Sequence, residues 1–152
     1  MRLRHIELTA WRCFVHNTRV GPFHDGLNVV HAPNGTGKST LFAALRRAML
    51  DAHRTGGAEV QALCSWGREL APRVSVEFEY DGVGYRIEKQ FLKGASSLLS
   101  RVENGLHAPF ADGEAANAMV AASVEDLKLL PGFVDDAVPF LFRQRTVSLV
   151  LE

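Results

Sequence analysis

The sequence predicts an α/β fold of one domain, in which a glycine-bearing loop joins a buried strand to an amphipathic helix. Residues 27–31 form a short apolar run with adjacent valines, and the glycines of residues 32–40 follow at once. Apolar residues then recur at three- and four-residue steps over 39–53, which is typical of one helix face. Further along, apolar and polar residues alternate strictly, which predicts an added antiparallel β-hairpin.

The first third of the chain predicts strands before the loop and a helix after it. Apolar residues within 3–8 indicate an opening strand, and the turn residues of 17–25 surround a second one. The run 27–31 predicts a buried strand. The helix of residues 39–53 should end at the glycines of 55–57.

The middle of the chain changes to a period of two. Residues 74–80 alternate, Asp81-Gly82 predicts a turn, and a strand resumes over 85–89. A third strand is expected over 96–102. The alanine-rich stretch 111–130 predicts a helix.

Length and composition indicate a single lobe. A chain of 152 residues with 47% hydrophobic content suits one compact domain with a core and is short for two. No apolar run approaches the ~20 residues that cross a bilayer, so no membrane partner is expected. Two cysteines are too few for a disulfide scaffold, which favours reduced thiols and a cytoplasmic location. The six histidines are scattered and predict no metal site.

Charge is balanced overall but unevenly distributed. Seventeen basic and seventeen acidic residues cancel, so composition does not indicate a nucleic-acid binder. Residues 1–54 carry eight Lys or Arg against three Asp or Glu, a net of +5, and the remainder carries nine against fourteen, a net of −5. A basic first third suits phosphate binding. It is weak evidence for DNA, because solvated faces often show this bias.

The segment HAPNGTGKST, residues 31–40, carries the pattern of a phosphate-binding loop between a strand and a helix. Glycines let successive backbone N–H groups turn toward one anion, and the following helix directs its partial positive charge to the same point. A glycine-rich turn that merely precedes a helix is the alternative. The candidate nucleotide-binding residues are Asn34, Gly35, Thr36, Gly37, Lys38, Ser39 and Thr40.

Three side chains of this loop have distinct predicted roles. Lys38 should reach the β- and γ-phosphates and is a candidate catalytic residue, the Ser39 hydroxyl should ligate magnesium, and Thr40 should lie near the α-phosphate. One position departs from GxxxxGK[ST], since Ala32 stands where the first glycine is expected. If Ala32 needed positive φ, its methyl group would cost roughly 1–2 kcal/mol.

Several segments together resemble one family. They are Trp11-Arg12-Cys13-Phe14, GLNVVHAPNGTGKSTLFAAL and VSVEFEYDGVGYRIEKQFLKG, and they resemble the N-terminal ATPase lobe of the SMC-like ATPases. Within that group the chain looks most like SbcC and the ATPases of DNA double-strand-break repair that pair with a nuclease, and more distantly like RecF and RecN. The resemblance implies the half head of an ABC-type P-loop NTPase with an added antiparallel hairpin sheet.

In that family a long coiled coil splits the nucleotide-binding domain, and the C-terminal lobe supplies the signature motif and a carboxylate pair. The sequence contains neither an LSGGQ-like string nor four apolar residues ending in Asp-Glu. Residues 1–152 therefore look like one N-terminal lobe without the C-terminal lobe and coiled coil. The partners that the resemblance implies are that C-terminal lobe, a second head in an ATP-dependent dimer, a nuclease subunit, and DNA through the complete assembly.

The resemblance adds three site residues, each with an alternative. Arg12 matches a basic residue that touches the phosphates; it could instead be a surface arginine after an edge strand. Gln144, in FLFRQRTV, matches a glutamine that touches magnesium and the attacking water, although Arg145 follows where the family usually has glycine. An exposed glutamine without a role is its alternative. Trp66 lies near where the family places a residue against adenine, and the alternative is a tryptophan packed in the core or at an interface.

These residues predict an ATPase with ATP and Mg²⁺ as cofactors. We expect it to hydrolyse ATP when its C-terminal lobe completes it, and we expect the chain alone to be inactive. The preference for ATP over GTP comes from the resemblance. A nucleotide-gated scaffold that assembles on ATP without efficient hydrolysis is an alternative. A small P-loop kinase is disfavoured, because a hairpin sheet follows the helix and the sequence shows no arginine-rich lid.

Overall fold

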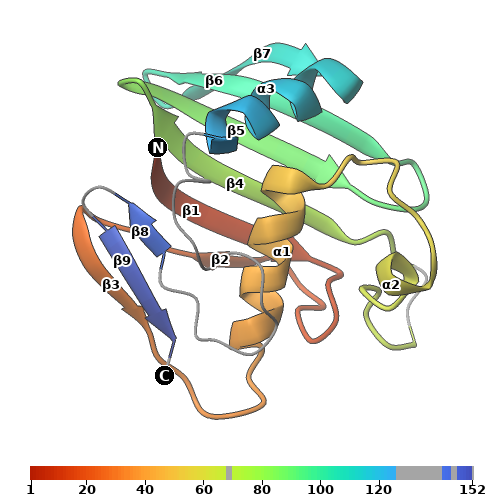
Figure 1. Cartoon of the computed structure of the whole chain (residues 1–152). Coiled ribbons are helices and arrows are strands. Elements are labelled where there is room, and N and C mark those ends of the chain that lie inside the picture. The colour runs from red at the N-terminus through yellow and green to blue at the C-terminus, as the bar shows by residue number, and fades with distance from the viewer. Residues whose placement is uncertain (68–69, 126–141, 145–146, 152) are drawn as a thin grey trace.

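The computed structural model describes the backbone of residues 1–67, 70–125, 142–144 and 147–151. Helices and two β-sheets make up this part of the chain (Figure 1), which confirms the predicted α/β class. The end of the helix predicted over 111–130 lies outside the described residues.

The larger sheet has six strands, all antiparallel to their neighbours, in the order β2-β1-β4-β5-β6-β7. Its strands are β1 (Arg2–Thr9), β2 (Thr18–Val20), β4 (Arg73–Tyr80), β5 (Val83–Gln90), β6 (Ser96–Glu103) and β7 (Leu106–Asp112). Strands β4 to β7 follow one another as hairpins. The N-terminal strand β1 pairs along the free edge of β4, and β2 pairs with β1 as the edge strand.

The predicted hairpin is confirmed in its pairing and its turn. Phe78 pairs with Tyr85, and their rings stack with centroids 5.8 Å apart. The turn residues Asp81 and Gly82 have φ of 50° and 74°, a conformation that two-residue hairpins favour because it matches the twist of the strands. The third strand expected over 96–102 is present as β6. Phe78 and Tyr85 therefore serve cross-strand packing.

The sequence pattern did not predict β7. Ala111, predicted as the first residue of a helix, lies in this strand, and the helix α3 (Gly113–Glu125) begins two residues later. Asn104 and Gly105, with φ of 52° and 77°, form the turn that precedes β7. Most side chains of β7 are exposed and Pro109 interrupts its hydrogen bonding, as an edge strand allows, so the strand has no apolar alternation to detect.

The smaller sheet contains the strand that leads into the loop. Strand β3 (Gly26–Val30) confirms the strand predicted over 27–31, one residue earlier at each end, and pairs in parallel with β9 (Val147–Leu151). Strand β9 pairs in turn with β8 (Phe142–Gln144), in antiparallel fashion. A segment distant in sequence therefore supports the strand before the loop.

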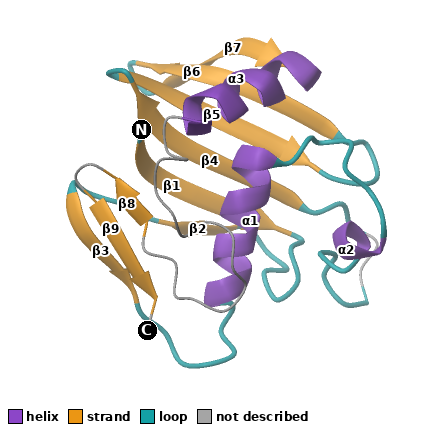
Figure 2. Ribbon diagram, viewed as in Figure 1, coloured by secondary structure: helices purple, strands orange, loops and turns teal. Residues whose placement is uncertain are grey.

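Helix α1 (Lys38–Leu50) begins one residue before the predicted start, at 39, and ends three residues before the predicted end, at 53. It ends because Asp51 is extended, with φ of −84° and ψ of 142°. A short helix, α2 (Ala58–Gln61), follows the predicted glycines. Helices α1 and α3 lie over the same face of the six-stranded sheet (Figure 2). None of the helices in the described part of the chain combines the length and apolar character that a membrane span requires.

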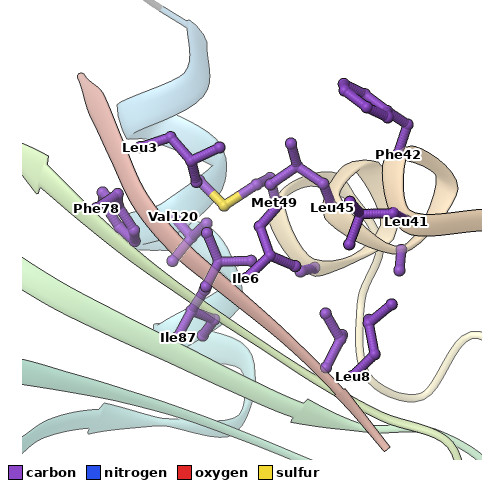
Figure 3. Packing of buried hydrophobic residues seen from close by; sticks show 14 of the residues in the cluster. Leu3, Ile6, Leu8, Leu41, Phe42, Leu45, Met49, Phe78, Ile87 and Val120 are labelled. Carbon is purple, nitrogen blue, oxygen red and sulfur yellow. The ribbon is translucent and has the colours of Figure 1, made fainter. Parts of the chain in front are cut away.

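The core lies between this face of the sheet and the two helices (Figure 3). Helix α1 contributes Leu41, Leu45 and Met49, whose four-residue spacing places them on one side of the helix, and β1 contributes Ile6 and Leu8. Each of these side chains is at most 3% exposed. Burying one such side chain stabilises the fold by roughly 1.5–3 kcal/mol. Apolar packing therefore holds the helix that follows the loop against the sheet.

The opposite face of the sheet carries a network of ion pairs. Arg86 donates hydrogen bonds of 2.9 Å to both Glu77 and Glu7, and Arg19 contacts the same two carboxylates. His5 Nδ1 lies 2.9 Å from Glu77. Burial alone would raise the pKa of Glu77, but the hydrogen bond from Arg86 and the charge of Arg19 outweigh it, so this pKa lies below its usual range.

This network predicts a contribution to stability that acid removes. A carboxyl whose folded-state pKa is lowered stabilises the fold fully above its ordinary pKa of 4.5 and loses that contribution as pH falls through the folded-state value. Glu77→Gln should lower the free energy of unfolding by about 1–3 kcal/mol at neutral pH and should flatten the acid limb of the stability profile. Urea denaturation between about pH 3 and pH 7 measures both.

The matched control for this prediction is Glu88→Gln. Glu88 is 46% exposed in its side chain and makes a single ion pair with Arg86 at 3.1 Å, so its loss should change stability by less than about 1 kcal/mol. If the free energy of unfolding of Glu77→Gln fell as steeply with acid as that of the unmodified chain, Glu77 would not be the source of the pH-dependent stability.

Candidate functional site

The predicted loop connects the end of β3 to the start of α1. Gly35 and Gly37 have φ of 82° and 100°, a region that other residues rarely adopt. Thr36 donates from its hydroxyl to the carbonyl of Pro33 at 2.8 Å, which closes a turn within the loop. The helix then begins with a hydrogen bond of 2.9 Å from the Leu41 amide to the Gly37 carbonyl.

Gly37 is also the point where the loop meets the rest of the domain. A Cβ at this position would lie 2.6 Å from Cys13 Sγ and 2.9 Å from Phe14 Cζ, both far inside van der Waals contact. At Gly35 no atom would lie within 4 Å. The loop therefore packs on residues 13–14 through Gly37, whereas Gly35 faces open space.

Ala32 fits the loop without strain. Among the described residues, the non-glycine positions with positive φ are Ala10, Arg12, Asp81, Leu92 and Asn104, and Ala32 is not one of them. The energetic cost that a positive φ at Ala32 would have imposed is therefore absent.

The N-terminus of α1 is available to an anion. No described side chain caps it, and its first turn contains no acidic residue. The first amides of a helix lack intrahelical partners and carry the positive end of the helix dipole, so they attract negative charge. Lys38 Nζ donates to the carbonyls of Ala32 and Pro33, and this contact curls the lysine around its own loop.

A cavity of about 370 Å³ opens beside the loop and collects most of the predicted site residues. Its lining residues are Arg12, Cys13, Asn34, Gly35, Gly37, Lys38, Ser39, Thr40 and Trp66. Of the candidates whose side chains the structure describes, Thr36 is the one outside this set. Cys13 was not predicted, although it directly follows Arg12 in the sequence.

Arg12 reaches this cavity from the segment after β1. Its φ is 49°, its backbone amide donates to the Leu63 carbonyl at 2.7 Å, and its Nε donates to the Ala62 carbonyl at 3.2 Å. Trp11, which precedes it, forms a β-bridge with Cys64. The segment after α2 therefore holds Arg12 in place through both its backbone and its side chain.

Trp66 forms the outer part of the same wall. Its side chain is 94% exposed, which excludes the alternative of a core tryptophan. This exposure is compatible with contact with a ligand and with contact with another protein.

Gln144 lies in the smaller sheet. It pairs with Val147, and Val147 pairs with Gly26, so the Gln144 backbone lies level with the start of β3 but is separated from it by β9. The loop leaves the opposite end of β3, after Val30. The side chain of Gln144 is outside the described structure, and its role at magnesium stays a prediction.

A second cavity, of about 400 Å³, lies on the opposite face of the six-stranded sheet. Its lining includes Glu7 and Glu88, and both carboxylates pair with Arg86. The loop cavity has no carboxylate among its described lining residues, and it contains Arg12 and Lys38. The loop cavity, although slightly smaller, is therefore the one suited to an anion.

The donor set at the loop fits magnesium only together with a bound anion. In the described parts of the chain, no three His, Cys, Asp or Glu side chains are grouped so as to hold a metal ion. Magnesium commonly binds through substrate phosphates and retained waters, with few protein ligands. The Ser39 hydroxyl at the cavity could supply one such ligand.

A strand, a glycine loop and an uncapped helix that begins with Lys38 and Ser39 define an α/β protein of the P-loop class. A family model described as an AAA domain matches residues 5–106. The chain belongs to this AAA-domain family. No curated protein matches the sequence.

Solved structures agree with this class. The RecF recombination mediator bound to ATP is 20% identical with a TM-score of 0.53, and the alignment covers 72% of this chain and 28% of that one. A chain described under ATP-driven dimerisation and DNA-stimulated activation of SMC ATPases is 18% identical with a TM-score of 0.54, covering 86% and 82%. The SMC head domain from Thermotoga maritima is 21% identical with a TM-score of 0.47, covering 73% and 39%.

The likeness to RecF and to the SMC ATPases confirms the predicted fold, an ABC-type P-loop head in its N-terminal part. The chain spans 39% of the length of the Thermotoga maritima SMC head chain and 28% of the RecF chain. At these identities the likeness concerns the fold.

Proposed function

We propose that this chain binds ATP with Mg²⁺ in the loop cavity and forms the N-terminal lobe, residues 1–152, of an SMC-like ATPase head. The observation that carries the proposal is the convergence of Lys38, Ser39 and Arg12 on one cavity at an uncapped helix N-terminus. Backbone amides from Asn34 to Gly37 would surround the phosphates. Lys38 would contact the β- and γ-phosphates, and Thr40 would lie near the α-phosphate.

Hydrolysis would need groups from a second lobe. Catalysis of phosphoryl transfer depends on positioning and on stabilising charge, with little covalent work by the protein. Lys38 and Arg12 would stabilise negative charge, the Ser39 hydroxyl would hold magnesium, and Gln144 would orient the attacking water. A C-terminal lobe would complete this set, and the chain alone should turn over ATP poorly.

The proposed partners follow from the resemblance and from what the similar structures are. The SMC ATPase structure is described with ATP-driven dimerisation and DNA-stimulated activation, and RecF as a recombination mediator. We therefore include a second head, DNA through the complete assembly, and a role in DNA repair or chromosome processing in the cytoplasm. A nuclease subunit is proposed on the resemblance to SbcC.

Calorimetric titration of the purified chain tests the nucleotide site. MgATP should bind with a measurable Kd, GTP more weakly, and inorganic triphosphate should compete. If neither MgATP nor triphosphate bound at millimolar concentrations, which correspond to about −4 kcal/mol, the proposed site would be wrong.

The second candidate is a scaffold that binds ATP to assemble without efficient hydrolysis. The Gln144 backbone lies level with the end of β3 that is remote from the loop, with β9 between them, and this position favours the scaffold. Single-turnover hydrolysis and ATP-dependent dimerisation, both measured on the chain combined with a C-terminal lobe, separate the two. A scaffold would dimerise without turnover, whereas an ATPase would do both.

Trp66 should contribute to binding through the base. Stacking on an aromatic ring adds about 1 kcal/mol, so Trp66→Ala should weaken MgATP binding roughly fivefold. Inorganic triphosphate has no base, so its affinity should not change. Trp66→Phe, which keeps an aromatic ring, should retain most of the ATP affinity. Equal losses for ATP and triphosphate would instead assign Trp66 a role in shaping the phosphate site.

A further inference from the structure

The loop cavity has two walls that come from different parts of the fold. One wall is the loop and the start of α1, with Lys38 and Ser39. The other follows β1 and α2 and presents Arg12 and Trp66. A single triphosphate would contact both walls at once, so its binding depends on the distance between them. Contacts that fix α1 relative to the Arg12 segment therefore affect the site.

The far end of α1 is held by a buried lysine of β5. Lys89 is 2% exposed, and its Nζ donates to the carbonyl of Asp51, the residue that ends the helix, at 2.6 Å. Arg47 in the last turn of α1 also pairs with the Asp51 carboxylate at 2.6 Å. An ammonium group at this position also interacts favourably with the negative end of the helix dipole.

The same end of β5 supports the other wall. Phe91, two residues after Lys89, is fully buried, and its ring meets Trp11 edge-on with centroids 5.7 Å apart. Trp11 precedes Arg12 and bridges to Cys64, in the segment whose carbonyls Arg12 contacts. Residues 89–91 therefore contact the far end of α1 and the residue that precedes Arg12.

The Lys89 contact supplies a directional constraint that the apolar core does not. Leu41, Leu45 and Met49 hold α1 against the sheet through non-directional apolar contacts, whereas the Lys89 hydrogen bond fixes one atom at the helix end. Burial lowers the pKa of Lys89 to about 8, against the attraction of the Asp51 and Glu114 carboxylates. A charged side chain at this position therefore costs stability that an apolar one would not.

We propose that Lys89 is a positioning residue for the nucleotide site: by tying the C-terminal end of α1 to β5, it sets the distance between the wall formed by Lys38 and Ser39 and the wall formed by Arg12. The inference rests on the proposed function, since the ligand that spans the two walls is a nucleoside triphosphate.

A double-mutant cycle on the full chain tests this role. Lys89→Met should weaken MgATP binding roughly fivefold, the equivalent of losing one well-placed hydrogen bond, without lowering the thermal unfolding temperature. In an Arg12→Ala background the same change should weaken binding less than about twofold, because the contact that misalignment disrupts is already gone. Lys93→Met, which removes an exposed lysine, controls for net charge and should have no effect in either background.

The outcomes separate this inference from the proposed function. If the unmodified chain failed to bind MgATP, the proposed function itself would fail. If that chain bound MgATP and Lys89→Met bound it equally well, or if Lys89→Met lost affinity equally in both backgrounds, the positioning role would be overturned. Should the methionine variant not fold, Lys89→Gln, which removes the charge and shortens the donor, replaces it in both backgrounds with the same expectations.

Discussion

Lys38→Ala should abolish MgATP binding by the isolated chain and ATP turnover by the chain completed with a C-terminal lobe. Lys38 starts α1 and lines the cavity, and the order of residues in the loop assigns its ammonium to the β- and γ-phosphates. Two hydrogen bonds to charged oxygens contribute about 3–6 kcal/mol, so the affinity should fall at least about hundredfold. Calorimetric titration measures binding, and a steady-state phosphate assay measures turnover.

Two controls make the Lys38 experiment specific. Lys93→Ala removes an exposed lysine far along the chain and should leave the Kd unchanged. Thermal unfolding should show that Lys38→Ala remains folded, because Lys38 bonds only to carbonyls of its own loop among its described contacts. Normal turnover in Lys38→Ala would remove the basis for assigning the loop to ATP.

Gly37→Ala should destabilise the domain and remove the nucleotide site at once. The φ of 100° is costly for alanine, by about 1–2 kcal/mol. In addition, the new methyl group would lie 2.6 Å from Cys13 Sγ and 2.9 Å from Phe14 Cζ, and such overpacking costs typically about 1–3 kcal/mol. The sum, about 2–5 kcal/mol, is large against the stability of a small domain. Urea denaturation and MgATP titration measure the two effects.

Gly35→Ala is the matched control, since it makes the same change two residues away. Its φ of 82° carries the backbone cost, but no atom lies within 4 Å of the added methyl group. The loss should therefore stay near about 1–2 kcal/mol. Equal destabilisation by the two substitutions would show that packing of the loop on residues 13–14 contributes nothing.

The fold could be predicted from sequence wherever the information is local. The loop and its flanking elements follow from glycine placement and apolar spacing, and the hairpin of β4 and β5 follows from alternation and the Asp81-Gly82 turn. Strand β7 could not be found, because its exposed side chains and Pro109 leave no periodic signal. The end of α1 was placed too late because no glycine or proline interrupts the sequence before Gly56, whereas in the structure the helix ends at Asp51, where Lys89 contacts it.

The site was predictable on one wall only. The roles of Lys38 and Ser39 follow from the order of residues in the loop. The approach of Arg12 and Trp66 to the same cavity depends on long-range contacts with residues 62–64, and only the family resemblance indicated it. Cys13 had no signal of its own, since its contact with Gly37 exists only in the folded chain.

The lysine that curls over Ala32 and Pro33 has a thermodynamic consequence for ligand capture. An extended lysine side chain loses up to about 2 kcal/mol of rotational entropy when it becomes ordered. In the free protein the ammonium of Lys38 is already restrained by two carbonyls, so much of that ordering precedes the arrival of a phosphate. When a phosphate binds, the Lys38 ammonium would exchange the two carbonyl acceptors for phosphate oxygens. The entropy of binding would then be more favourable than if a freely rotating side chain had to be immobilised.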